Sequence, residues 1–191
     1  MSPMGATALL LMDFQEEIVQ MVPEPQRASV LDKASRVLNR ARAAGVPVLH
    51  VVVCFREGYP EVHAGNKSFS ALRAAGRLLA DSAGAGIAER LQPLAGEPVV
   101  VKRRTSAFFG TELDTLLGAA SVKRLVLMGL VTGGVVISTV RWAADRDYEL
   151  VVVSDACADP DPEVHRVLME KLIPRQATVV TAEEVISTVI A

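Results

Sequence analysis

Three sets of residues that could take part in chemistry follow three separate apolar stretches of the chain. Asp13 comes directly after ALLLM, Lys102 directly after VVV, and residues 129–135 follow the stretch LVLM. In an open parallel sheet, ligands bind in the crevice beyond the carboxyl ends of the strands. We therefore expect the carboxylate, the ammonium and the turn to converge on one pocket, where a carboxylate of low solvation could act as a general acid or base.

Each of the two charged side chains also has a simpler interpretation. Asp13 could be a turn residue at the end of a strand, and Lys102 could be the first exposed residue beyond an edge strand. In a shared pocket, low solvation would raise the pKa of Asp13 and a nearby lysine would act in the opposite sense. Gln15, two residues after Asp13, is a candidate hydrogen-bonding group for a substrate.

Residues 129–136 read GLVTGGVV and are predicted to join a strand to a helix. At such a junction, backbone N–H groups point at a ligand and the helix dipole favours negative charge. The segment lacks the Gly-Lys-Ser/Thr of a nucleotide-binding P-loop and the Gly-x-Gly-x-x-Gly of a dinucleotide site. It is therefore a candidate cradle for a substrate oxygen, and no cofactor is predicted.

Apolar stretches alternate with segments of helical spacing along the chain, which predicts a mostly parallel sheet covered by helices on both faces. The expected fold class is α/β, a three-layer Rossmann-like open parallel sheet of about six strands, and residues 1–191 are expected to form a single domain. Strands are predicted at 7–13, 46–55, 98–102, 124–130, 149–155 and 178–181. Helices are predicted at 25–44, 135–147 and 163–172, with Gly45 as a left-handed cap and capping boxes at Thr111 and Thr181 opening two more.

Residues 56–68, REGYPEVHAGNKS, form the longest connection that is predicted. Loops of this length in compact domains often serve as lids. We expect this loop to bound the pocket, with Tyr59 as a substrate contact.

Composition excludes several classes of function. The formal charge of −2 gives no basic stripe, and one Trp, two Tyr and five Phe leave little to stack on bases, so no nucleic-acid partner is expected. No apolar run reaches the length of a membrane span, and residues 1–14 do not resemble a signal peptide. We expect a cytoplasmic protein with no membrane partner. Two cysteines make neither a disulfide framework nor a zinc site, and no metal site is predicted.

Two longer motifs carry a family resemblance. The first is Lys-x-x-x-Ser-Ala-Phe-x-x-Thr-x-Leu, which begins at Lys102, and the second is Gly-x-x-Thr-x-x-x-Val-x-x-Thr, which begins at Gly129. Together with Asp13 they resemble the isochorismatase-like (cysteine hydrolase) superfamily over nearly the whole chain. The cysteine members have their nucleophile at the position of Val135, and a valine side chain cannot attack a substrate. The chain is thus identified as a member that lacks the nucleophilic cysteine.

The resemblance implies a site as well as a fold. Isochorismatases proper hydrolyse a vinyl ether without a cysteine at this position, with the Asp as general acid and the Lys nearby. Carried over, Asp13 and Lys102 would be catalytic, and backbone N–H groups near the turn would hold a substrate oxygen. Relatives also tend to have a non-proline cis peptide, which would lie between Val131 and Thr132. The predicted substrate-binding residues are Gln15, Tyr59, Phe108, Val131, Thr132, Gly134 and Val135.

The predicted function is that of a hydrolase for a small molecule that could be anionic, by Asp/Lys acid–base chemistry without a cysteine. Water activated directly by Asp13 could instead cleave an amide or carbamoyl group. The non-enzymatic alternative is a catalytically degenerate member, a ligand-binding or structural protein in which Asp13 and Lys102 form only a buried ion pair. A homo-oligomer is expected, since half of the residues in this small chain are hydrophobic.

Overall fold

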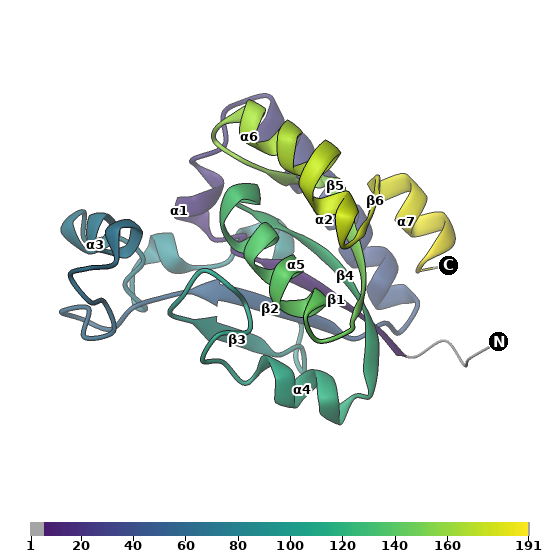
Figure 1. The fold of residues 1–191 in the computed structure, drawn as a ribbon, viewed down its shortest axis with the longest axis horizontal. Helices are drawn as coiled ribbons and strands as arrows, with labels where there is room; N and C mark the ends of the chain where they lie inside the picture. The colour runs from purple at the N-terminus through teal and green to yellow at the C-terminus, as the bar shows by residue number, and fades with distance from the viewer. Residues whose placement is uncertain (1–5, 191) are drawn as a thin grey trace.

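The computed structural model describes residues 6–190, and a parallel sheet of six strands forms their centre (Figure 1). The strand order is β3-β2-β1-β4-β5-β6, which confirms the predicted Rossmann-like α/β class. The strands are β1 (Ala6–Met12), β2 (Val48–Val53), β3 (Val99–Lys102), β4 (Val122–Leu130), β5 (Glu149–Ala158) and β6 (Thr178–Val180).

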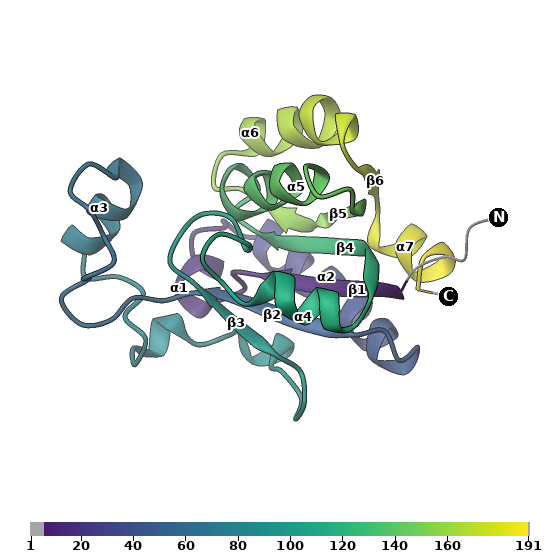
Figure 2. The same ribbon diagram turned by 60° about the horizontal axis from the view of Figure 1, so that its bottom comes forward.

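Helices cover both faces of the sheet (Figure 2). The chain reverses its direction along the sheet after β3, and because crossovers between parallel strands are right-handed, the helices that connect β3 to β4 and β4 to β5 fall on the opposite face from α2. Thus α2 packs with α7 on one face, while α4 and α5 lie across the other (Figures 1 and 2). The helices are α1 (Glu16–Val19), α2 (Gln26–Ala43), α3 (Lys67–Ala74), α4 (Leu113–Ala119), α5 (Ile137–Ala144), α6 (Pro162–Val167) and α7 (Ala182–Thr188). Shorter helical turns are η1 (Ala83–Ala85), η2 (Glu89–Leu91), η3 (Thr132–Val136), η4 (Leu168–Leu172) and η5 (Ile173–Arg175).

The centre of the core is the pair β1 and β4, which is covered by helices on both faces. For this reason β1 is a continuous apolar run in which Leu9, Leu10 and Leu11 are all buried. The two strands approach closely at their carboxyl ends, where Met12 is opposite Gly129. A Cβ atom at Gly129 would lie 2.6 Å from the Met12 carbonyl oxygen, so the close approach requires glycine.

Helix ends agree with the sequence at two places and differ at a third. Gly45 follows α2 with φ +68°, the predicted left-handed cap, and Thr181 forms a reciprocal capping box with Glu184. The capping box predicted at Thr111 is absent, because α4 begins only at Leu113 and Glu112 is its N-cap. The Thr111 hydroxyl instead donates a hydrogen bond to the Ala107 carbonyl at 2.7 Å.

Candidate active site

A pocket of about 390 Å³ lies at the carboxyl edge of the sheet, beyond the ends of β1, β3 and β4. Helix α3 and the residues after it, which project from the body of the molecule (Figure 1), supply further lining residues. Most of the lining is apolar. The lining residues are Asp13, Ile18, Met21, Val53, Ser68, Phe69, Leu72, Arg77, Leu78, Lys102, Thr105, Leu130, Val131, Gly133, Gly134 and Val135.

Asp13 and Lys102 form an ion pair in this pocket. The Lys102 Nζ atom lies 2.8 Å from Asp13 Oδ2, and only 5% of Asp13 and 2% of Lys102 are exposed. Asp13 adopts a left-handed backbone conformation with φ +59°, which aspartate tolerates better than most residues, and its N–H donates to the Val51 carbonyl at 2.8 Å. The predicted proximity of the two residues is confirmed, and their catalytic role stays a prediction.

The surroundings of Asp13 favour its acid form. Burial raises the pKa of the Asp13 carboxyl above its ordinary value, and the adjacent Lys102 ammonium offsets only part of this rise. The second carboxyl oxygen, Oδ1, is also buried, and nothing within residues 6–190 forms a hydrogen bond with it. Because Asp13 lines the pocket, its carboxyl group can exchange a proton with a molecule bound there.

The turn after β4 borders the pocket, but it differs from the prediction in two respects. The cis peptide lies between Leu130 and Val131, one bond earlier than the resemblance implied. In addition, the Gly133 N–H donates to Asp159 Oδ2 at 2.7 Å and the Gly134 N–H donates to the Val131 carbonyl at 3.0 Å. These two N–H groups have protein acceptors, so they are not available as the predicted cradle for a substrate oxygen.

Thr132 is fully buried behind this turn and is not among the lining residues. Its hydroxyl forms a 2.8 Å hydrogen bond with His165 Nδ1 of α6. Burial lowers the pKa of His165, and the charge of Asp159 counteracts this only in part. Thr132, His165 and Asp159 therefore tie the turn to the segment that follows β5, and Thr132 does not face the pocket as a substrate contact would.

Gln15 is also withdrawn from the pocket. It is fully buried, and its Oε1 accepts the Val53 N–H at 2.8 Å. Its Nε2 donates to the carbonyl oxygens of Val53 at 3.0 Å and Ala85 at 2.8 Å. The side-chain amide thus joins β2 to the segment at η1 and has no free group for a substrate.

The two aromatic residues predicted as substrate contacts pack elsewhere. The buried Tyr59 ring lies 5.6 Å from that of Phe55 between centroids, and its hydroxyl donates to the Arg77 carbonyl at 2.7 Å. The Phe108 ring packs 6.1 Å from Tyr148. Neither Tyr59 nor Phe108 lines the pocket.

The predicted lid contributes little to the pocket wall. Of residues 56–68, only Ser68 lines the pocket, and Ser68 already belongs to α3. The wall comes instead from Phe69 and Leu72 of that helix and from Arg77 after it. The physical reason is that the apolar residues of α3 face inward, whereas the loop before it is largely polar.

Sequence reasoning missed Arg77 and Asp159. Asp159 directly follows β5. It could have been found in the same way as Asp13, as a polar residue at the carboxyl end of a parallel strand. Arg77 gives no such signal, because its place at the pocket depends on how α3 and the residues after it fold against α1.

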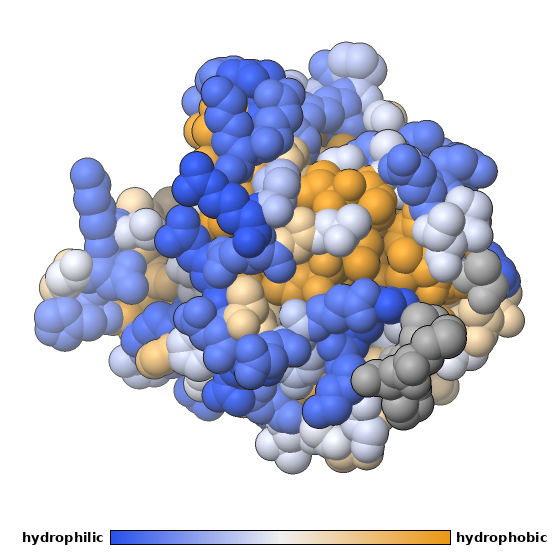
Figure 3. All heavy atoms as spheres, turned by 45° about the vertical axis from the view of Figure 1, so that its right-hand side comes forward, coloured by the Kyte–Doolittle hydropathy of each residue, from blue (hydrophilic) through white to orange (hydrophobic). Residues whose placement is uncertain are grey.

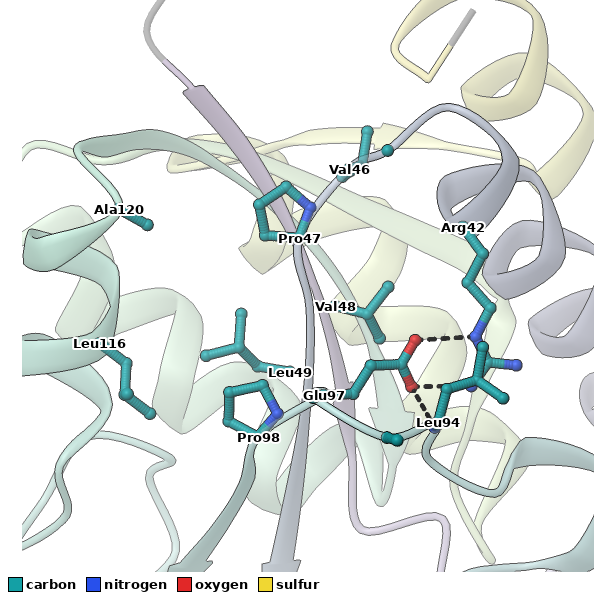
Figure 4. A pocket seen from close by; sticks show the side chains of 13 residues that line it. Arg42, Val46, Pro47, Val48, Leu49, Leu94, Glu97, Pro98, Leu116 and Ala120 are labelled. Atoms are coloured by element: carbon teal, nitrogen blue, oxygen red, sulfur yellow. Dashed lines mark hydrogen bonds and ion pairs between the residues drawn. The ribbon is translucent and has the colours of Figure 1, made fainter.

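A second pocket, about 470 Å³ in volume, lies at the opposite edge of the sheet, where β2 and β3 begin (Figure 4). Its charged groups satisfy one another: Arg42 binds both oxygens of Glu97 at 2.8 Å, and the buried His50 contacts Glu97 at 3.1 Å. These Arg42 hydrogen bonds lower the pKa of Glu97 to about 2. The cluster is a closed ion-pair network, and the carboxyl edge remains the candidate active site.

Comparisons with known proteins agree with this geometry. The isochorismatase domain family matches residues 7–184. The chain belongs to the isochorismatase family. It is 31% identical to the uncharacterized isochorismatase family protein YddQ of Bacillus subtilis, over 93% of this chain and 97% of YddQ. It is 29% identical to the ureidoacrylate amidohydrolase RutB of Yersinia enterocolitica, over 84% of this chain and 79% of RutB. The crystal structure of an isochorismatase family protein from Desulfovibrio vulgaris superposes with a TM-score of 0.85 at 29% identity, covering 98% of this chain and all of that one.

In this isochorismatase-family hydrolase, neither native cysteine lines the candidate active site. Val135 does so instead, from the turn η3 that leads into α5. Cys54 and Cys157 are both buried free thiols. Burial raises the pKa of Cys54 and raises that of Cys157 to about 12, which keeps both thiols protonated and poorly nucleophilic.

Residues 6–190 contain neither a candidate metal-binding cluster nor a candidate membrane-spanning helix. No group of three or more His, Cys, Asp or Glu side chains in this range could hold a metal ion. None of the helices there is long and apolar enough to cross a membrane.

Proposed function

We propose that this isochorismatase-family hydrolase cleaves small vinyl ethers by acid catalysis from Asp13 and does not use a cysteine. The observation that carries the proposal is the buried Asp13 carboxyl, 2.8 Å from Lys102, with an unpartnered oxygen atom and a raised pKa. The apolar Val135 beside it supports a reaction that needs no covalent attack by the protein.

In the proposed reaction, Asp13 transfers its proton to the terminal carbon of the enol ether. The carbon–carbon double bond becomes a single bond, and the positive charge is shared between the adjacent carbon and the ether oxygen. Lys102 stabilises the Asp13 carboxylate that is left. Water then adds to the cationic carbon and returns a proton to Asp13, and the resulting hemiketal breaks its carbon–oxygen bond to give a ketone and an alcohol.

The test uses a panel of 2-alkoxyacrylates, whose hydrolysis releases pyruvate. Asn has the shape of Asp and suits the left-handed conformation at position 13, so Asp13→Asn should fold normally while turnover falls by about 100-fold to 10,000-fold. The rate of the native protein should also fall as the pH rises through the Asp13 pKa, because only the acid form donates a proton. Pyruvate release measures turnover and its pH dependence, and circular dichroism measures whether Asp13→Asn is folded.

The matched control is Asp32→Asn, which removes an exposed carboxylate on α2 that pairs with Arg90 at the surface. It should leave turnover unchanged. Pyruvate release by Asp13→Asn at the native rate would contradict the proposed acid. If no 2-alkoxyacrylate is hydrolysed even by the native protein, the vinyl-ether substrate class is wrong.

A second candidate reaction is hydrolysis of an amide or carbamoyl group by water that Asp13 activates. The similarity to RutB, an amidohydrolase by name, favours it. Against it, a general base must be ionised, whereas burial favours the acid form of Asp13. Release of ammonia from ureido or carbamoyl compounds, lost in Asp13→Asn, would select this reaction.

The reducing cytoplasm remains the compartment that we propose, since both cysteines are free thiols.

A further inference from the structure

The charged side chains that line the candidate active site do not balance, because Glu17, the carboxylate that pairs with Arg77, is not among the lining residues. Its lining contains one carboxylate, Asp13, and two cationic side chains, Lys102 and Arg77. Lys102 pairs with Asp13 at 2.8 Å, which leaves Arg77 as the charged group at a separate part of the lining. When Asp13 is in its acid form, the charges on the lining residues are positive only, which favours an anionic ligand.

Glu17 holds the Arg77 guanidinium, and Tyr59 holds the Arg77 backbone. Its Nε atom pairs closely with Oε1 of Glu17 on α1, and its Nη2 atom donates to the Glu17 carbonyl at 3.4 Å. The other Glu17 carboxylate oxygen accepts the Leu78 N–H at 3.2 Å. The Tyr59 hydroxyl donates to the Arg77 carbonyl at 2.7 Å. A guanidinium fixed in this way binds a ligand with little loss of side-chain entropy.

Part of the Arg77 guanidinium remains available. Its side chain is 35% exposed, and no hydrogen bond joins its Nη1 atom to any residue in the range 6–190 that the structure describes. A planar guanidinium presents its N–H donors as a fork that matches the two oxygens of a carboxylate. The free terminal nitrogen can therefore add a hydrogen bond to a ligand in the pocket.

The remaining lining limits the rest of the ligand. Between the two charged groups the pocket is mostly apolar, and its volume of about 390 Å³ suits a small molecule. An apolar body is therefore required along with the anionic group. The apolar side chains come from α1, α3, β4 and the turn after it, and they include Ile18, Phe69, Leu72, Leu130 and Val135.

We propose that Arg77 is the carboxylate-binding residue of this pocket, for small monoanionic substrates with an apolar body, and that Glu17 and Tyr59 position it. The proposal rests on the proposed function only in taking this pocket as the substrate site. Binding of the carboxylate at Arg77 leaves Asp13 and Lys102 free to act on another part of the same molecule.

A purely structural role for Arg77 predicts a different pattern. If the Arg77–Glu17 pair only fastens the residues after α3 to α1, then Glu17→Gln and Arg77→Gln should impair ligand binding alike. If Arg77 binds the carboxylate, Glu17→Gln keeps a side-chain oxygen that can accept from Arg77 Nε and so still positions the guanidinium. It also removes a competing negative charge, so acid binding should be equal or tighter. The two variants therefore separate the two roles.

The experiment measures binding by isothermal titration with two matched pairs of probes, benzoate with benzamide and isobutyrate with isobutyramide. The native protein should prefer each acid to its amide. Arg77→Gln should weaken binding of both acids by about tenfold or more, as expected for a lost charge-assisted hydrogen bond, and should leave the amides within about twofold. Arg73→Gln, an arginine in the last turn of α3 that does not line the pocket, is the control and should change nothing.

An equal affinity of the native protein for acids and amides, or a preference for acids that persists in Arg77→Gln, would overturn the proposal, as would parallel losses in Glu17→Gln and Arg77→Gln. If Arg77→Gln does not fold, Arg77→Lys is measured in its place, because lysine keeps the positive charge but lacks the paired N–H donors of the guanidinium. It should weaken acid binding by about threefold, and unchanged binding would overturn the proposal. Acid preference with no turnover of 2-alkoxyacrylates would leave Arg77 supported and refute only the proposed reaction.

Discussion

Val135 bears directly on the chemistry that we propose for the site. It lines the pocket together with Asp13 and Lys102, and its side chain has no atom that can form a covalent intermediate. The two native cysteines are both buried, and neither is among the lining residues. The reaction that we propose accordingly uses Asp13, Lys102 and water, with no covalent attack by the protein.

The environment of Val135 can be tested by placing a thiol there. In Val135→Cys, the start of a helical segment and the nearby Lys102 should lower the pKa of the new thiol below the ordinary value of about 8.5. Iodoacetamide should label it at least about tenfold faster than either native cysteine at neutral pH. The native protein should keep its activity after the same treatment. Mass spectrometry of the labelled peptides measures the rates, and equal labelling of position 135 and Cys54 would contradict the expectation.

At the residue scale, the sequence was informative where a side chain follows a strand. Asp13 and Lys102 could be placed together because the carboxyl ends of parallel strands share one edge. Gln15 could not be excluded in the same way, since its amide forms hydrogen bonds with residues 38 and 70 positions away. Such partners come from the tertiary structure, and the pattern of neighbouring residues does not indicate them.

Among the elements, the contact between β1 and β4 depends most on one residue. Gly129 lies opposite Met12, and a methyl group there would meet both the Met12 carbonyl oxygen at 2.6 Å and its Cβ atom at 2.9 Å. The backbone of a central strand cannot move aside as a flexible side chain can. The strands that lead into Asp13 and into the turn can therefore pair this closely only because residue 129 has no side chain.

Two glycine substitutions should have opposite effects on stability. Gly129→Ala should lower the free energy of unfolding by about 1–3 kcal/mol, because it forces the central strands apart. Gly118→Ala in α4, where nothing lies within 4 Å of the added methyl group, should raise it by about 0.5–1 kcal/mol through helix propensity. Urea unfolding measures both, and a Gly129→Ala protein as stable as the native one would refute the close-contact argument.

The elements themselves were predicted well where periodicity is strong and less well at their ends. All six strands lie within a few residues of the predicted ranges, since buried parallel strands are continuous apolar runs. The two capping boxes had the same pattern of residue types, yet only Thr181 forms one. The Thr111 hydroxyl donates instead to Ala107, a choice that depends on the path of the preceding loop.

At the scale of the whole molecule, apolar groups remain at the surface. Figure 3, turned toward the side on which α7 lies, shows a hydrophobic area bordered by hydrophilic residues. Elsewhere Phe109 is 51% exposed and packs edge-on against Trp142 at 5.9 Å between centroids. Exposed apolar surface of this kind favours association.

Homo-oligomer formation stays a prediction, with the Tyr59 loop or the helix around Trp142 near the subunit boundary, and the exposed Phe109 beside Trp142 makes the second the one to test first. Sedimentation velocity at micromolar concentration should show a species heavier than one chain, and Phe109→Ser should shift it toward the monomer. Leu94→Ser, a second exposed apolar position at the other edge of the sheet, is the control. Dissociation by Leu94→Ser alone would place the boundary elsewhere, and a monomeric native protein would rule out the oligomer.

The order of the strands also governs what happens while the chain is being made. Strand β1 is central and pairs with both β2 and β4, but β4 is synthesised after β2, β3 and α4. Until β4 leaves the ribosome, one edge of β1 is an unpaired row of backbone groups within a mostly apolar segment, the kind of edge on which nascent chains aggregate. The strand that leads into the proposed catalytic acid thus keeps one unpaired edge until β4 has been synthesised.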